Sequence, residues 1–189
     1  MEYTTLGRNG VKISRICLGT MMFGSPTSEA DSIDIINKAY DDGVNFIDTA
    51  NVYNDGESER ITGKAIKDTR DKVVLVTKVC GPRGDGINDG GVSRYHIMNE
   101  VENSLRRLGT DYIDIYMLHR AVYDCPIEES LRALDDLVAQ GKFRYPGCSN
   151  FYGYELAQAL WISDRNRCAP MAVVQPLYNC LLYTSPSPR

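Results

Sequence analysis

The chain has 189 residues, of which 43% are hydrophobic, and its 21 Lys and Arg against 25 Asp and Glu give a formal net charge of −4. This length and composition predict one domain with a real core, and they argue against disordered and collagen-like chains. No basic run is present to bind nucleic acid or an anionic membrane. Because the N-terminus lacks an export pattern and no apolar stretch approaches about 20 residues, we expect a soluble, cytoplasmic protein.

The first element that the sequence predicts is a small β-hairpin over residues 3–13. Asn9-Gly10 lies there between two short extended pieces. An Asn-Gly pair in this setting is the strongest short-range hairpin signal.

Six short apolar runs, rich in β-branched residues, predict buried strands beyond the hairpin. They begin near residues 16, 45, 73, 112, 143 and 172, and apolar residues at helical spacing lie between several of them, over 33–40, 101–108 and 131–138. One strand-plus-helix unit takes about 30 residues, which matches the spacing of the runs. The longest step contains a Gly-rich segment, 81–91, which we interpret as a mobile loop that ends where Ser93 can cap the next helix.

The repeated units predict an α/β chain built as part of a (β/α)8 TIM barrel. A closed barrel needs eight units and typically about 250 residues, whereas only about six units are visible here. We therefore expect an incomplete barrel over residues 1–179, preceded by the hairpin. Residues 180–189 carry two Ser-Pro steps and no helical pattern, and we interpret them as a non-native, adapter-like read-through tail.

Polar residues follow the apolar body of every predicted strand. In a parallel barrel all carboxyl ends of the strands share one face, where catalytic residues lie, so these positions should converge. Each residue alone has an ordinary explanation, such as a helix cap or a turn, and only their convergence indicates a site. In chain order they are Gly19 and Thr20, Asp48, Lys78, His119, Ser149 and Asn150, and Gln175.

Several ordered motifs resemble those of the aldo-keto reductases. Residues 43–53 (GVNFIDTANVY) carry the clearest match. Further matches are residues 56–59, 62–66, 76–78, 105–114 leading to His119, 126–129, 141–142, 147–150 and 175–179. The resemblance covers about residues 3–179, and several motifs in order are far more specific than one glycine motif.

The resemblance implies a (β/α)8 barrel that reduces an aldehyde or ketone with NADPH, or with NADH, and without a metal. It places the catalytic residues at Asp48, Tyr53, Lys78 and His119. It also implies cofactor-binding positions at Gly19, Thr20, Met21, Asp48, Ser149, Asn150 and Gln175. The expected partner is a small carbonyl compound; substrate identity and oligomeric state stay open.

The implied chemistry explains these residue types. Hydride that arrives at a carbonyl carbon leaves negative charge on the oxygen, so the site must supply a proton. Tyr53 is the candidate acid. The positive charge of Lys78 would favour its phenolate, Asp48 would keep Lys78 protonated, and a neutral His119 would orient the carbonyl.

The cysteine and histidine spacings argue against metal chemistry. The six cysteines form no Cys-x-x-Cys pair, and we expect reduced, mostly buried thiols. His96 and His119 alone cannot build a three-His zinc site.

Two features depart from the family pattern. Pro146 falls in the fifth predicted strand, where a proline removes a ladder hydrogen bond, so we expect local distortion beside Ser149. The last two βα units are not visible, and open strand edges predict that the 189 residues alone are unstable and poorly active.

Two other functions stay open. The first is a non-catalytic nicotinamide-binding regulator that resembles potassium-channel β subunits. The second is an unrelated doubly wound nucleotide binder, against which the lack of Gly-x-Gly-x-x-Gly after the first strand argues.

Overall fold

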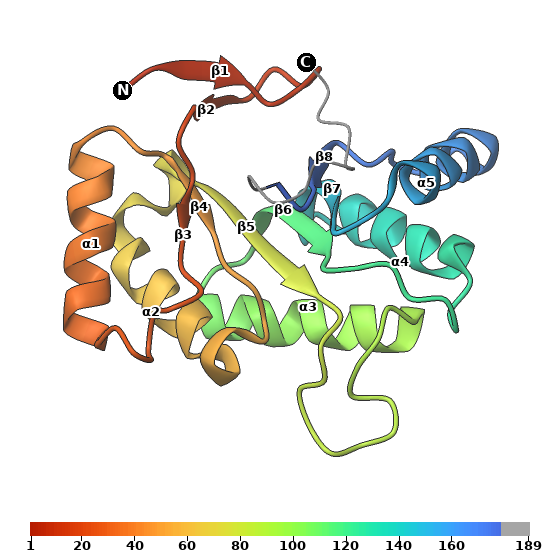
Figure 1. The fold of residues 1–189 in the computed structure, drawn as a ribbon, viewed down its shortest axis with the longest axis horizontal. Coiled ribbons are helices and arrows are strands. Elements are labelled where there is room, and N and C mark those ends of the chain that lie inside the picture. Colours follow the sequence, from red (N-terminus) through yellow and green to blue (C-terminus); the bar gives the residue numbers. More distant parts are fainter. Residues whose placement is uncertain (179–189) are drawn as a thin grey trace.

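The computed structural model describes residues 1–178. Its first two strands, β1 (Tyr3–Thr5) and β2 (Lys12–Ser14), pair antiparallel and confirm the predicted hairpin. Figure 1 shows this hairpin at one end of the molecule, with the long loop between β5 and α3 at the opposite end. Residue 179 and the predicted tail at 180–189 lie outside the described residues.

A parallel sheet of six strands forms the centre of the molecule. Neighbouring strands in the sheet are consecutive in the chain, so the order is β3-β4-β5-β6-β7-β8. Each predicted run became one strand. The strands are β3 (Leu18–Gly19), β4 (Phe46–Asp48), β5 (Val74–Val79), β6 (Ile113–Leu118), β7 (Phe143–Ser149) and β8 (Val173–Gln175).

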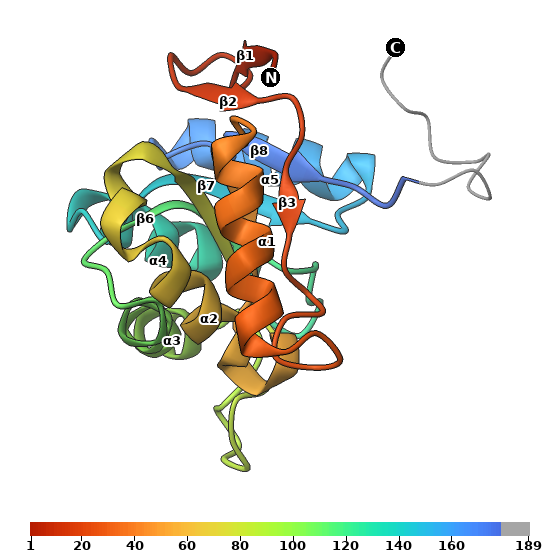
Figure 2. The same ribbon diagram turned by 90° about the vertical axis from the view of Figure 1, so that its left-hand side faces the viewer.

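This strand order is the order of a parallel barrel. The sheet curls and the hairpin lies across one of its ends, as the turned view in Figure 2 shows. The structure therefore bears out an incomplete TIM barrel with an N-terminal hairpin.

Five helices connect the strands, and they are α1 (Glu29–Asp41), α2 (Glu57–Ala65), α3 (Arg94–Leu108), α4 (Ile127–Ala139) and α5 (Gly153–Asn166). Two 3-10 turns, η1 (Tyr53–Gly56) and η2 (Lys67–Lys72), flank α2. The apolar spacing predicted α1, α3 and α4. It did not predict α2 or α5, since both bury polar side chains, such as Ser58 and Glu59 in α2 and Glu155 in α5.

Alternation along each strand separates two cores. In β5, Leu75 and Val79 pack in the large core between sheet and helices, whereas Val74 and Val76 pack in a smaller core on the concave side. Leu6 and Ile13 of the hairpin region belong to this smaller core. The hairpin thereby buries apolar surface at the amino ends of the strands, opposite the end where the predicted site lies.

The capping prediction is confirmed at the start of α3. The hydroxyl of Ser93 accepts a hydrogen bond from the backbone N–H of His96 at 3.2 Å. This cap ends the Gly-rich loop at the expected residue.

The distortion expected at Pro146 does not occur. The carbonyl of Pro146 accepts a hydrogen bond from the N–H of Ala172, just before pairing with β8 begins at Gly147 and Val173. Since the N–H and C=O of one strand residue point to the same side, the missing donor of Pro146 faces the region before β8 starts. The proline therefore removes no ladder bond, and β7 continues in register to Ser149.

The cysteines of the described chain are unpaired. All five that precede residue 169 are free thiols, and three of them, Cys80, Cys148 and Cys168, are buried. Within residues 1–178, no helix has the length and apolar character that a membrane crossing requires. The same residues contain no group of three or more His, Cys, Asp or Glu placed to bind a metal ion.

Candidate active site

Four predicted side chains converge at the carboxyl end of the sheet. Asp48 ends β4, Lys78 lies in β5, Tyr53 begins η1 and His119 directly follows β6. The Nζ of Lys78 donates hydrogen bonds to Oδ1 of Asp48 at 2.6 Å and to the Tyr53 hydroxyl at 3.4 Å. The rings of Tyr53 and His119 meet edge to face with centroids 5.8 Å apart. The structure thus joins residues that are up to 71 positions apart in the sequence.

The loop that carries Tyr53 is fixed by backbone hydrogen bonds to β5. The N–H of Thr49 donates to Val76, and the N–H of Asn51 donates to Lys78. The turn continues through two residues with positive φ, Asn54 at 45° and Asp55 at 56°. This conformation is uncommon except in Gly, Asn and Asp, so the sequence supplies the residue types that the turn requires.

The side chain of Asn54 holds this turn against the loop after β3. Its Nδ2 is within hydrogen-bond distance of three backbone carbonyls, those of Met21, Phe23 and Ser25. The loop that follows β3 is thereby attached to the turn that carries Tyr53.

Burial sets the charge states of the site. Desolvation raises the pKa of Asp48, although the charge of Lys78 and hydrogen bonds from Lys78 and Gln175 act in the opposite direction. Desolvation and then the positive charges of Lys78 and Arg120 lower the pKa of His119 to about 4. The imidazole of His119 is therefore neutral at pH 7 and has one N–H to donate.

Three further predicted residues lie together beside His119, at the ends of β7 and β8. Ser149 pairs with Gln175 in the sheet, and its hydroxyl donates to the Gln175 carbonyl at 3.1 Å. The side-chain amide of Asn150 donates to the carbonyl of His119 at 3.0 Å and to the Ser149 hydroxyl at 3.1 Å. These contacts place hydroxyl and amide groups next to the four residues described above.

The three predicted residues at the end of β3 have different surroundings. Gly19 and Met21 are exposed at the rim. Thr20 is fully buried, and its hydroxyl bonds the carbonyl of Asp48 and the hydroxyl of Ser58 in α2. The side chain of Thr20 thus supports the sheet and is turned away from the open face.

A buried charged cluster, which the sequence patterns did not predict, lies behind the site. Glu59 of α2 and Glu100 of α3 both bind the guanidinium of Arg107. One signal could have pointed to it, because Glu100 and Arg107 are seven residues apart and so share one face of a helix.

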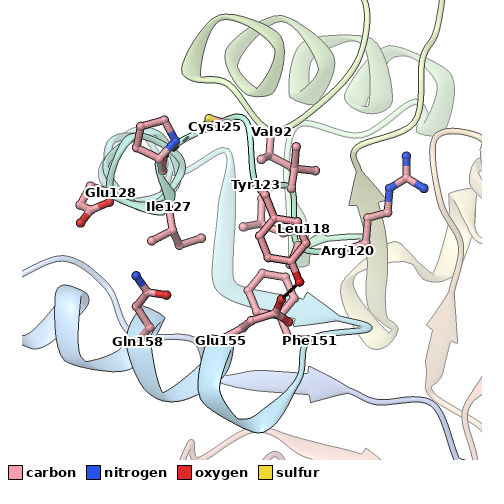
Figure 3. Close-up of a pocket in the computed structure, with 13 residues that line it drawn as sticks. Val92, Leu118, Arg120, Tyr123, Cys125, Ile127, Glu128, Phe151, Glu155 and Gln158 are labelled. Atoms are coloured by element: carbon pink, nitrogen blue, oxygen red, sulfur yellow. Dashed lines mark hydrogen bonds between the residues drawn. The ribbon is translucent and has the colours of Figure 1, made fainter.

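A separate pocket of about 210 Å³ lies where α4 and α5 begin (Figure 3). Its floor includes Leu118 and Phe151, and at its edge Tyr123 donates a hydrogen bond to Glu155 at 2.5 Å. None of the predicted catalytic or cofactor residues lines this pocket.

Comparison with known proteins assigns the chain to a family. The model of the Aldo/keto reductase family matches residues 15–188. The chain belongs to the aldo-keto reductases. This confirms the resemblance inferred from the sequence motifs and supports carbonyl reduction as the general chemistry of the family.

Several curated relatives of this aldo-keto reductase have similar sequences. The uncharacterized oxidoreductase YrpG of Bacillus subtilis is 41% identical over 98% of the chain and 60% of its own length. The aldo-keto reductase AMT2 of Alternaria alternata is 38% identical over 95% of the chain and 58% of its own length. A probable voltage-gated potassium channel subunit beta of Arabidopsis thaliana is 36% identical over 95% of the chain and 56% of its own length. The chain thus spans about 60% of the length of the curated relatives that it matches.

Proposed function

We propose that the whole protein reduces an aldehyde or ketone to an alcohol, with NADPH as the favoured hydride donor and NADH as the other candidate. The observation that carries this proposal is the position of the Lys78 ammonium, 2.6 Å from Asp48 and 3.4 Å from the Tyr53 hydroxyl. A phenol beside a buried cation is suited to give a proton to a carbonyl oxygen that gains negative charge.

The residues present fit a nicotinamide ring. Ser149, Asn150 and Gln175 offer hydroxyl and amide groups on two neighbouring strand ends, and a carboxamide needs such a mixture of donors and acceptors. We propose that these three side chains hold the carboxamide and that the exposed rim at Gly19 and Met21 lies along the cofactor. When bound, the nicotinamide supplies the hydride, and the protein supplies binding and orientation.

Each member of the tetrad has a defined task in this proposal. Tyr53 donates its proton to the carbonyl oxygen, and Lys78 stabilises the phenolate that remains. Asp48 compensates the buried charge of Lys78, because a buried charge without a partner is costly. His119 is neutral and donates its N–H to the same carbonyl oxygen, which orients the substrate.

We propose the cytoplasm as the place of action and a small carbonyl compound as the partner. The five described cysteines are free thiols. Free thiols are typical of a compartment that keeps cysteines reduced.

The alternative is a regulator that binds nicotinamide without turnover. It is favoured by one observation, the 36% identity to the probable potassium channel subunit of Arabidopsis thaliana. A regulator of this kind would bind the cofactor but would not reduce successive substrate molecules.

A measurement of catalytic turnover distinguishes a carbonyl reductase from a nicotinamide-binding regulator. In the whole protein that contains residues 1–178, we expect oxidation of NADPH that depends on 4-nitrobenzaldehyde. Tyr53→Phe should lower kcat at least about 100-fold and retain NADPH binding, measured by fluorescence. Tyr95→Phe, an exposed position in α3, is the matched control and should keep full activity. Cofactor binding without turnover would favour the regulator, and full activity in Tyr53→Phe would show that another group is the acid.

A further inference from the structure

A buried charged cluster lies between α2 and α3, behind the proposed site. Arg107 donates through Nε to Glu59 and through Nη2 to Glu100, at 2.5 Å in each case. The side chains of Glu59 and Glu100 are 0% and 2% exposed, and that of Arg107 is 12% exposed. Three charged groups thus meet in the interior with a net charge of −1.

Hydrogen bonds connect this cluster to β5 at two points. The Thr77 hydroxyl donates to Glu59 at 2.6 Å, and Thr77 directly precedes Lys78 in the strand. The side-chain amide of Asn51 donates to Glu100 at 3.1 Å, and the backbone N–H of Asn51 donates to the carbonyl of Lys78. The contacts therefore form a closed ring that begins and ends at adjacent residues of β5.

Both ends of this ring lie next to catalytic candidates. Asn51 is two residues before Tyr53, and Thr77 is one residue before Lys78. Within residues 1–178, the hydroxyl of Tyr53 has one hydrogen-bond partner, Lys78, at the long distance of 3.4 Å. The position of the phenol therefore depends on the contact of its ring with His119 and on its backbone, and the ring of contacts adds side-chain links to the backbone hydrogen bonds that attach this loop to β5.

Within the cluster, Glu100 and Arg107 are held in their charged forms. Burial alone would raise the pKa of Glu100, but hydrogen bonds from Asn103, Arg107 and Asn51 and the charge of Arg107 outweigh it and lower that pKa. Burial alone would lower the pKa of Arg107, but the charges and hydrogen bonds of Glu59 and Glu100 outweigh it and raise that pKa. Buried ion pairs are weak contributors to stability when compared with apolar packing. Their directed hydrogen bonds, in contrast, fix geometry well.

We propose that Glu59, Glu100 and Arg107 are positioning residues for carbonyl reduction, and that they act through Thr77 and Asn51 on the contact between Lys78 and Tyr53. This inference rests on the proposed function. The ring fixes the position of the loop that carries Tyr53 relative to β5, the strand that carries Lys78. Loosening it leaves all four proposed catalytic side chains present but places the phenol less accurately over the carbonyl.

The test removes one link without removing a charge. Thr77→Val deletes the hydroxyl that donates to Glu59, whereas Glu59 keeps its bond to Arg107. In the whole protein we expect kcat to fall between about 10-fold and about 100-fold, with little change in the Kd for NADPH or in KM. Thr77→Ser restores the hydroxyl and should restore kcat. Thr62→Val is the matched control, since Thr62 is also buried but its hydroxyl has no hydrogen-bond partner among the described residues, and it should leave kcat unchanged.

A second variant and a second readout exclude a merely structural role. Asn51→Ala opens the ring at its other link and should lower kcat to a similar extent, and both variants should shift the pH profile of kcat. An unchanged kcat and pH profile in folded Thr77→Val or Asn51→Ala overturns the inference, as does failure of both variants to fold. If Tyr53→Phe is fully active, the proposed function fails; if it is inactive while the ring variants are normal, only the positioning inference fails.

Discussion

The ammonium of Lys78 and the carboxylate of Asp48 form an ion pair at 2.6 Å in which the lysine side chain is only 1% exposed. Within the described chain, neither residue has a second ionic partner. The remaining protons of Lys78 go to the carbonyl of Thr49 and to Tyr53. Each charge of this pair therefore depends on the other for compensation.

This dependence predicts a large coupling free energy between the two residues. Lys78→Met leaves a buried carboxylate unpaired, and Asp48→Asn leaves a buried ammonium unpaired, so each should cost about 3–5 kcal/mol of the free energy of unfolding. The double variant removes both charges and should cost clearly less than the two single changes together. Urea unfolding of the four proteins measures the cycle. If the loss of unfolding free energy in the double variant equals the sum of the two single losses, solvent rather than the partner residue compensates each charge.

His119 makes the stability of the fold depend on pH. Its pKa is about 4 in the fold and 6.5 ordinarily, so between these values the unfolded chain binds the additional proton. Stability is therefore fully present above about pH 6.5 and is lost as the pH falls toward 4, by about 3 kcal/mol. The measurement is the free energy of unfolding of the native protein minus that of His119→Gln, from pH 7 to pH 4.

That difference should decrease on acidification, because the Gln variant lacks the titrating group. Curves that stay parallel down to pH 4 would mean that the imidazole titrates normally in the fold. The same reasoning predicts no acid limb from His119 in the pH profile of kcat between pH 5 and pH 8.

Local sequence patterns were sufficient for the sheet and for the end of the sheet where the site lies. The run 112–118 is apolar apart from Asp114 and shows little alternation of apolar and polar residues, which is typical of a strand buried on both faces, and its residues 113–118 became the fully buried β6. Polar residues at strand ends then had to converge, because the ends of parallel strands meet on one face. Asp48, Lys78 and His119 came together for this reason.

The buried cluster of Glu59, Glu100 and Arg107 could not be predicted from local sequence patterns in the same way. Glu59 is buried in a short helix that has little apolar spacing, and its partner Arg107 is 48 residues away. A charged residue in such a segment predicts a solvent-exposed face when it is taken alone. Only the packing of α2 on α3 shows that these charges are paired and face inward.

The two outer strands predict self-association of the 189-residue chain when it is produced alone. Within residues 1–178, both β3 and β8 pair on one side only, and Val174 in β8 is 43% exposed. An unpaired apolar edge is a template for pairing with another chain, and a charged side chain blocks such pairing. Val174→Lys should therefore reduce the aggregated fraction in size-exclusion chromatography, whereas Ile87→Lys, in the exposed Gly-rich loop, should not. Equal aggregation of both variants would place the association elsewhere.

The contact between α2 and α3 gives the last prediction. A Cβ atom on Gly63 would lie 2.1 Å from the backbone oxygen of Leu108 and 2.7 Å from its Cα. Because the atoms in the way belong to the backbone of Leu108, a larger residue at position 63 must push α2 and α3 apart. Alanine favours a helix by about 1 kcal/mol over glycine, but the overlap should outweigh this gain.

We expect Gly63→Ala to lower the free energy of unfolding by a net amount of about 1–3 kcal/mol. The matched control is Gly153→Ala at the start of α5, where an added Cβ meets nothing within 4 Å. That change should be neutral or stabilise the protein by up to about 1 kcal/mol, because alanine restricts the unfolded chain. Both values come from urea unfolding of the whole protein. Equal stability of the two variants would show that α2 can move away from Leu108 without loss, in which case α2 could not hold Glu59 firmly against Arg107.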